Sequence, residues 1–266
     1  IGAALCTFGL GGAVFALIEQ PNLGWGSPVI WATFAAGILL FALFLWRQRS
    51  ATAPMLPLDL FRIRNFWTGN IATLFVYAAL SLNGFVVTVY LQQEAGFSAT
   101  LAGLASLPTT VMMVLLSASM GSLSDRFGPR IFMTVGPLVM AGGSLLLLTV
   151  TDPVNYWLQL LPGLILFGLG LAITVSPLTA AILGAVDPAR SGIASAVNNA
   201  IARIAGLLII ATLATIVAGS LDLDGFRRAA IVTAGLMVAG GIVSFLGIRN
   251  SDVAPVEKRA EPATGA

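Results

Sequence analysis

The residues best suited to chemistry are neutral polar side chains that recur along one apolar stretch, residues 66–92. Their spacings of three and four positions place them on one face of an α-helix. The set is Asn70, Thr73, Tyr77, Ser81, Thr88 and Gln92, with Gly84 between Ser81 and Thr88. These groups exchange hydrogen bonds without changing charge, so they suit binding and guiding a small molecule better than proton transfer.

Lipid disfavours such a polar face, so it must contact protein or a water-filled cavity. Packing between helices is one interpretation, because Ser, Thr and Gly are common at helix contacts in membranes. The wall of a substrate pathway is the other, and we prefer it because the stripe runs the whole length of the span.

A second set of small and polar residues follows the same spacing around an arginine. It consists of Gly192, Ser195, Asn199, Ala202, Arg203 and Gly206. Arg203 is either an intramembrane cation near a pathway or an inner gate, or a side chain that reaches the inner lipid headgroups. We favour the headgroup position, with the apolar span running from residue 204 to residue 221. Asn199 joins the expected substrate pathway.

The segment "GSLSDRFGPR", residues 121–130, gathers charge between two apolar runs. Gly121 allows helices to approach closely, and Gly128 permits a tight reversal before the next helix. Asp125 lies near that helix's N-terminus, where Arg126 and Arg130 can pair with it. Such a cluster can lock two helices together in one state and release them in another, so we expect these residues to act as a gate.

The rest of the sequence offers little to a catalytic or metal site. The chain contains no histidine and one cysteine, Cys6, and every Asp and Glu falls outside the expected spans. We therefore expect no enzyme activity, no cofactor, no metal site and no catalytic residue. Basic residues cluster beside apolar runs and form no separate stripe, which argues against a nucleic-acid partner.

Composition explains how these residues are positioned. Hydrophobic residues make up 58% of the 266 residues, charged residues make up 9%, and mean hydropathy is +0.96. The apolar residues form continuous runs that are long enough to cross a lipid bilayer as helices. The expected fold class is therefore an all-α polytopic membrane protein. Eight spans are predicted, at residues 1–18, 28–46, 66–91, 99–120, 131–150, 156–183, 193–219 and 229–248.

Alternate connections differ strongly in their Lys and Arg content. One side receives Arg47, Arg49, Arg62, Arg64, Arg126, Arg130, Arg190, Arg249, Lys258 and Arg259, and the other receives Arg227 and Arg228. Such an excess is typical of the cytoplasmic side. The expected organisation is a helix pair at 1–46, a cytoplasmic connecting loop at 47–65, a six-helix bundle at 66–248 and a disordered cytoplasmic tail at 249–266.

The pattern G-x-L-x-D-R-x-G-x-R at 121–130 resembles the loop signature of the major facilitator superfamily. The stretches "APMLPLDLFRIRNFWTGN", "VVTVYLQQEAGFSATLAGLASLP" and "ARSGIASAVNNAIARIAG" are similar to segments of its fourteen-span drug:proton antiporter family, the EmrB/QacA type. The resemblance implies an extra helix pair plus the C-terminal six-helix bundle.

It also implies a missing N-terminal six-helix half, which would carry the proton-binding carboxylate. The implied activity is multidrug efflux across a bacterial inner membrane, with small amphiphilic compounds as substrates and protons as the coupling ion. A major facilitator exporter of a specific metabolite or antibiotic, and a non-transporting membrane subunit, stay open as alternatives.

Overall fold

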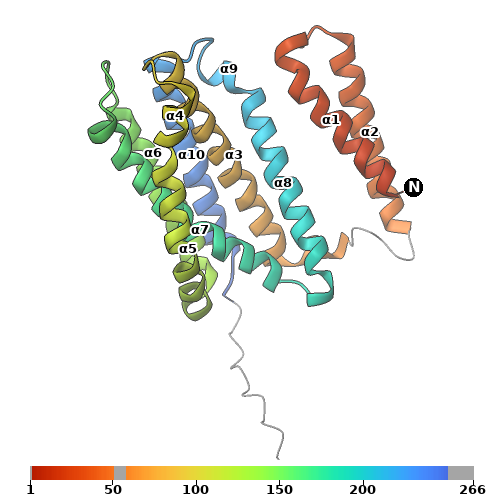
Figure 1. Cartoon of the computed structure of the whole chain (residues 1–266). Coiled ribbons are helices and arrows are strands. Elements are labelled where there is room, and N and C mark those ends of the chain that lie inside the picture. The colour runs from red at the N-terminus through yellow and green to blue at the C-terminus, as the bar shows by residue number, and fades with distance from the viewer. Residues whose placement is uncertain (1, 51–57, 251–266) are drawn as a thin grey trace, which may run out of the picture.

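The structure, a computed structural model, describes residues 2–50 and 58–250, and these residues form helices joined by short turns, without strands (Figure 1). Eight of its helices are long and apolar enough to cross a membrane, which confirms the predicted fold class. The α-helices are α1 (Gly2–Leu23), α2 (Pro28–Ser50), α3 (Arg64–Gln93), α4 (Ala99–Ala105), α5 (Leu107–Phe127), α6 (Pro129–Leu146), α7 (Leu161–Gly184), α8 (Ser191–Ala211), α9 (Leu213–Ile216) and α10 (Leu223–Gly247). Short helical turns add η1 (Leu58–Arg62), η2 (Leu147–Thr149), η3 (Tyr156–Leu160) and η4 (Pro188–Arg190).

Several helix boundaries differ from the predicted spans. The predicted fourth span is divided into α4 and α5, and α5 continues through most of the expected loop to Phe127. The seventh span was expected to reach residue 219, but α8 ends at Ala211 and only the four-residue α9 follows. Left-handed backbone at Ala218 and Gly219 then turns the chain. Continuous apolar sequence hid this turn, because hydropathy alone carries no signal for a helix end.

The predicted connecting loop and tail lie partly outside the described residues. Helix α2 takes residues 47–50 from the expected loop, residues 51–57 are not described, and η1 and the start of α3 complete the interval. Most of the predicted tail, residues 251–266, is likewise outside the described part of the chain.

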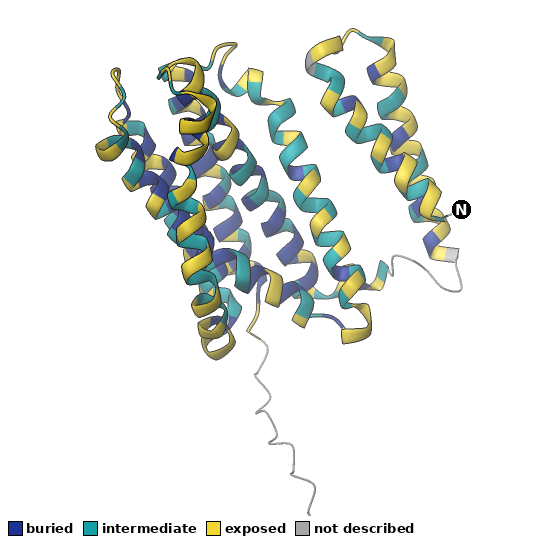
Figure 2. Cartoon of the chain, viewed as in Figure 1, coloured by how far each residue is buried: buried dark blue, intermediate teal, exposed yellow. Residues whose placement is uncertain are grey.

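Four helices form the buried centre of the bundle: α3, α6, α7 and α10. Roughly half of the residues in the apolar window of each are buried, against 11% in the α4–α5 span and 17% in α8. Figure 2 shows this contrast, with dark-blue residues in the central helices and yellow residues along α5 and α8. The α1–α2 pair lies beside α8, which α1 contacts. Helix α5 and the exposed face of α8 are therefore open edges of the bundle.

Facing glycines let α6 and α7 approach closely. A Cβ atom at Gly143 would lie 2.6 Å from the backbone nitrogen of Phe167, and one at Gly170 would lie 2.6 Å from the carbonyl oxygen of Gly136. In lipid, helices associate through such close packing, because burying apolar surface there gives little driving force.

Charged residues divide the bundle into two ends. We call the end with Arg64, Arg126, Arg130 and Arg190 the basic end, and the end with Glu94, Asp152, Asp222 and Asp224 the acidic end. At the acidic end α10 begins earlier than predicted, so Arg227 and Arg228 belong to the helix instead of the preceding loop.

Two arginines from distant helices hold the last turn of α10 at the basic end. Arg64 donates from Nε to the Gly247 carbonyl (2.8 Å) and from Nη2 to the Leu246 carbonyl (2.7 Å). Arg130 donates from Nε to the Phe245 carbonyl (2.9 Å). The last carbonyls of a helix have no partner within it, so these bonds fix α10 to the N-termini of α3 and α6.

The glycine contacts of α6 can be tested with neighbouring substitutions. Gly143→Ala should destabilise the protein by about 1–3 kcal/mol, because backbone atoms of α7 occupy the space of the new methyl group. Gly142→Ala should be neutral or slightly stabilising, since its Cβ would meet only Leu166 Cδ2, at 3.6 Å. Thermal unfolding of the purified protein, followed by tryptophan fluorescence, measures both. Equal melting temperatures for the two variants would contradict the close approach of α6 and α7.

Candidate functional site

The polar stripe of α3 is covered along its basic half. Asn70 and Thr73 are 4% and 0% exposed, and both contact Asn198 of α8. The Asn198 Nδ2 atom donates to Thr73 Oγ1 at 2.7 Å and to Asn70 Oδ1 at 3.3 Å. A Cβ at Gly206 would lie 2.6 Å from Ser81 Oγ. In this half, the structure shows the helix packing that the sequence left open as an alternative.

Along the acidic half the same stripe is open. Gly84 and Gln92 are exposed, and a Cβ at Gly84 would meet no atom within 4 Å. Thr88 is half-buried and donates to the Gly84 carbonyl at 2.8 Å. Tyr77, between the two halves, is also half-buried. Within the described α3 stripe, the part from Gly84 to Gln92 is the most accessible.

Two neighbouring asparagines of α8 take different positions. Asn199, which we expected along the substrate pathway, is exposed and has no hydrogen bond among the described residues. Asn198, which the sequence did not single out, contacts α3. Both asparagines fit a polar face, and only the rotation of α8 about its axis shows which one faces Asn70.

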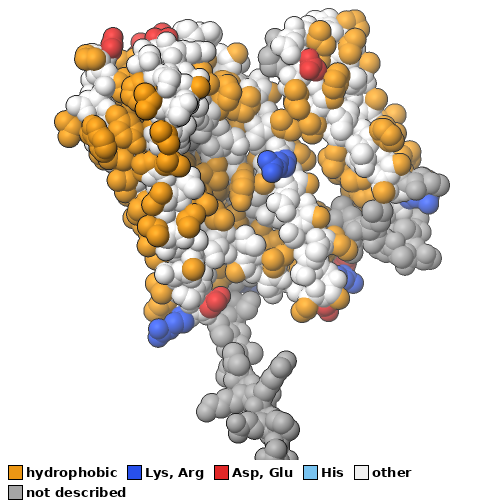
Figure 3. Space-filling model, viewed as in Figure 1, with side chains coloured by type: hydrophobic (Ala, Val, Ile, Leu, Met, Phe, Trp, Pro, Cys, Tyr) orange, Lys and Arg blue, Asp and Glu red, His pale blue; other side chains and the backbone are white. Residues whose placement is uncertain are grey.

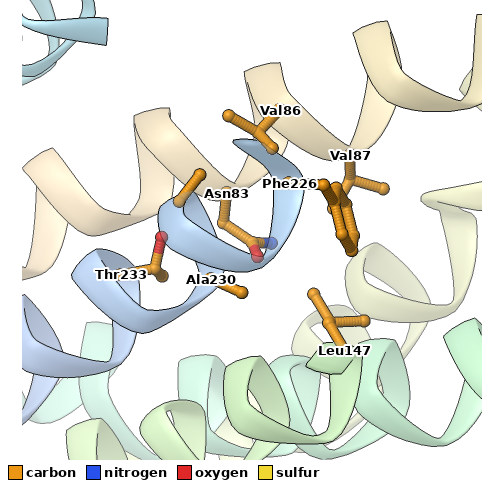
Figure 4. Close-up of a pocket in the computed structure, with 8 residues that line it drawn as sticks. Asn83, Val86, Val87, Leu147, Phe226, Ala230 and Thr233 are labelled. Atoms are coloured by element: carbon orange, nitrogen blue, oxygen red, sulfur yellow. The ribbon is translucent and has the colours of Figure 1, made fainter. Parts of the chain in front are cut away.

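A further polar residue of α3, Asn83, was not part of the expected stripe. It is 8% exposed and points toward α10, where it meets Ala230 and Thr233 (Figure 4). Phe226, stacked on Tyr90 at a centroid distance of 4.4 Å, lines the same small space. This space has no room for a water molecule, so Asn83 belongs to the packing of α3 on α10.

The two glycines of the 121–130 segment both serve close contacts. A Cβ at Gly121 would lie 2.6 Å from Ser176 Oγ of α7. Gly128 has φ +82, and the side chain of Asn250 occupies the place where its Cβ would be. Residue 128 therefore has to be glycine for two reasons, backbone conformation and space.

The charged residues of this segment separate in the structure, contrary to the expected pairing. The side chain of Arg130 donates to the Phe245 carbonyl and lies over the Phe245 ring at 4.8 Å. Asp125 and Arg126 are exposed, and neither forms an ion pair with any described residue. Asp125 borders a cavity of about 280 Å³ that Asn65, Ala180, Ala181, Gly184 and Ala185 also line. Arg130 thus anchors a helix, whereas Asp125 and Arg126 are free to meet another surface.

Arg203 lies farther from the basic end than the expected headgroup position implies. It is exposed on α8, about 18 Å along the helix axis from Ser191. Other charged residues of the described helices lie within about two turns of a helix end. The expectation rested on an apolar span at residues 204–221, whereas α8 continues through Arg203 and ends at Ala211.

Sequence analysis missed a groove between α5 and α7. It has a volume of about 520 Å³ and combines hydroxyl groups with apolar side chains. Its lining is Met113, Ser117, Ala118, Val175, Ser176, Thr179, Ala180 and Leu183. Scattered Ser and Thr residues in apolar helices are ordinary, so only the pairing of α5 with α7 reveals that these hydroxyls share one surface.

An ion pair crosses the basic end outside the spans. Arg190 Nη1 lies 2.6 Å from Asp59 Oδ2, which links η1 to η4. The hydrogen bond and charge of Arg190 lower the pKa of the Asp59 carboxyl. The pair therefore contributes fully at neutral pH, and its contribution is lost when acidification protonates Asp59. Both side chains are substantially exposed, so solvent and salt weaken this link.

The described residues contain no group of three His, Cys, Asp or Glu side chains placed to hold a metal ion. The site therefore consists of neutral polar groups, two open helix edges and one arginine far from any helix end. Its surfaces can bind and guide an amphiphile.

Comparison with known proteins identifies similar sequences along the whole chain. Residues 1–209 and 70–265 each match the model of the Major Facilitator Superfamily. A methylenomycin A resistance protein of Bacillus subtilis (strain 168) is 33% identical over 218 residues, which are 82% of this chain and 47% of that protein.

Two further relatives have related names. A methylenomycin A resistance protein of Streptomyces coelicolor is 29% identical over 91% of this chain and 51% of its own length. The multidrug resistance protein Stp of Mycobacterium tuberculosis is 32% identical over 83% of this chain and 41% of its own. The chain thus spans about half the length of the curated relatives it matches.

The contact between α3 and α8 can be tested at the two neighbouring asparagines. Asn198→Ala should lower the free energy of unfolding by about 1 kcal/mol, because buried Asn70 and Thr73 lose their shared donor. Asn199→Ala is the matched control and should have little effect. Combining Asn198→Ala with Thr73→Val measures the coupling between the two helices. Strict additivity of the two substitutions would contradict the contact.

Proposed function

Because the chain belongs to the major facilitator superfamily, we propose that it forms the C-terminal part of a fourteen-span transporter that exports small amphiphilic compounds in exchange for protons. Its residues 66–248 form the second six-helix bundle, and residues 1–46 form the extra pair. Proton coupling requires a titratable group in the membrane. We assign that carboxylate to a preceding six-helix half, because the acidic residues of the described helices lie near their ends.

One observation carries this proposal: the bundle has two open edges, and hydroxyl-bearing surfaces lie beside them. Helix α5 borders the groove with Ser176 and Thr179, and the stripe of α3 opens at Gly84 near α8. A second six-helix half resting on α5 and α8 would convert these surfaces into one central pathway between two bundles. The relatives' names, which refer to resistance, support an outward direction of transport.

In this assembly the basic end faces the cytoplasm, following the excess of arginine there. The C-terminus is then cytoplasmic, and the protein resides in the bacterial inner membrane. Asp125 and Arg126, exposed beside the cavity at this end, act as the gate by docking against the other half when the pathway closes inward. Gly121, Gly128 and Arg130 hold the gate segment in position through their contacts with Ser176, Asn250 and Phe245.

A specific antibiotic exporter is the second candidate. It is favoured by relatives whose names refer to single compounds, among them a tetracenomycin C resistance and export protein of Streptomyces glaucescens, 33% identical over 77% of this chain. A broad groove lined by apolar and hydroxyl groups suits many amphiphiles and so favours the multidrug alternative.

Transport can be measured with the full-length protein in a bacterial strain that lacks its own drug pumps. We expect lower accumulation of several amphiphilic dyes, and we expect a protonophore to abolish the difference. Asp125→Asn should reduce efflux several-fold without lowering the amount of protein, whereas Asp224→Asn at the acidic end should not. Resistance to one antibiotic class alone would favour the second candidate. Efflux that persists without a proton gradient would contradict antiport.

Accessibility of α3 can be mapped with single cysteines in a Cys6→Ser background. Cysteine at Gly84 or Gln92 should react quickly with a water-soluble maleimide, because both positions are open. Cysteine at Asn70 or Thr73 should react slowly, since α8 covers both. A bound substrate should slow the reaction at Gly84. Equal labelling rates at all four positions would contradict a substrate pathway along this face of α3.

A further inference from the structure

The depth of Arg203 follows from the register between α3 and α8. These helices pack side by side, with Asn198 level with Thr73 and Gly206 level with Ser81. Arg203 is therefore level with the residues around Tyr77. Tyr77 lies close to the midpoint of α3, a helix long enough to cross the bilayer. Arg203 thus lies near the middle of the membrane.

Nothing in the described chain neutralises this charge. The guanidinium has no ion pair and no hydrogen bond with any residue of 2–50 or 58–250. Arg203 is exposed on α8. Figure 3 shows basic atoms over this helix with apolar and uncharged groups around them. The headgroups lie too far away for one side chain to reach from this depth. An arginine keeps its proton in proteins, so neutralisation must come from an anion.

The neighbours of Arg203 favour one kind of anion. Its planar guanidinium can donate two parallel hydrogen bonds to a carboxylate. Tyr77 supplies a hydroxyl group at the same level on α3, and Asn199, one turn away on α8, supplies an exposed amide. Neither neighbour carries a competing positive charge. The surroundings are apolar, so an uncompensated arginine is costly here and a single carboxylate would be held strongly.

We propose that Arg203 binds a carboxylate at the middle of the membrane. This inference rests on the proposed transport function and defines its substrate class: amphiphiles that carry one carboxylate are bound in preference to their neutral analogues. A carboxylate of the preceding half is the other source of the same chemistry. The two sources give different results in one set of measurements.

The test uses the full-length protein in lipid nanodiscs and two probes of equal shape, 1-naphthylacetate and 1-naphthylacetamide. If the carboxylate belongs to the transported compound, the acid should bind about tenfold more tightly than the amide, the size of one charge-assisted hydrogen bond. Arg203→Gln should remove this difference, and Arg203→Lys should retain part of it. Arg228→Gln, which removes an exposed arginine at the acidic end, should leave it unchanged.

If the carboxylate belongs to the protein, neither probe should be preferred, and Arg203→Gln should lower the melting temperature. Neutralising one acidic residue of the preceding half should then restore it. The proposal is overturned if Arg203→Gln alters neither the probe preference nor the melting temperature. It is also overturned if the probe preference is unchanged, the melting temperature falls and no such neutralisation restores it. Binding is measured without transport, so a failure of efflux and a failure of the anion site remain distinguishable.

Discussion

The hydrocarbon core of a bilayer supplies no hydrogen bonds, and this constraint determines how the chain is built. Backbone groups are satisfied within helices, and side-chain hydroxyls return to the carbonyl one turn earlier, as Thr73 and Thr88 do with Gly69 and Gly84. Helix association depends on close approach, so glycines are concentrated where α6 meets α7. The bundle is held by backbone contact and by a few buried polar bonds.

The same constraint makes the distribution of polar groups informative about function. Asn70, Thr73 and Asn83 are buried against neighbouring helices and stabilise the bundle. Gly84, Gln92 and the hydroxyls of the α5–α7 groove remain accessible beside the open edges. Arg203 stands apart from both groups, because a charge at the centre of a membrane helix costs about 2.5–3.5 kcal/mol on insertion scales. A residue this costly needs a compensating partner.

The sequence predicted the number of spans and the fold class, since both depend on apolar length alone. It left two interpretations open for the α3 stripe, and the structure shows helix packing along one half of it. It did not single out Asn198, because the residue that faces Asn70 depends on the rotation of α8 about its axis. It placed the apolar span beside Arg203 at residues 204–221, because the helix end at Ala211 falls within continuous apolar sequence. It paired Arg130 with Asp125 by proximity in sequence, whereas the preferred acceptor is the carbonyl of Phe245, more than a hundred residues away.

The bonds from Arg64 and Arg130 to α10 also bear on how the protein is made. Their acceptors are carbonyls of residues 245–247, the final turn of α10. During synthesis both arginines emerge from the ribosome long before these acceptors exist. Closure of the basic end is therefore deferred until α10 has left the translocon. A nascent chain halted before residue 245 would leave both cations without these partners.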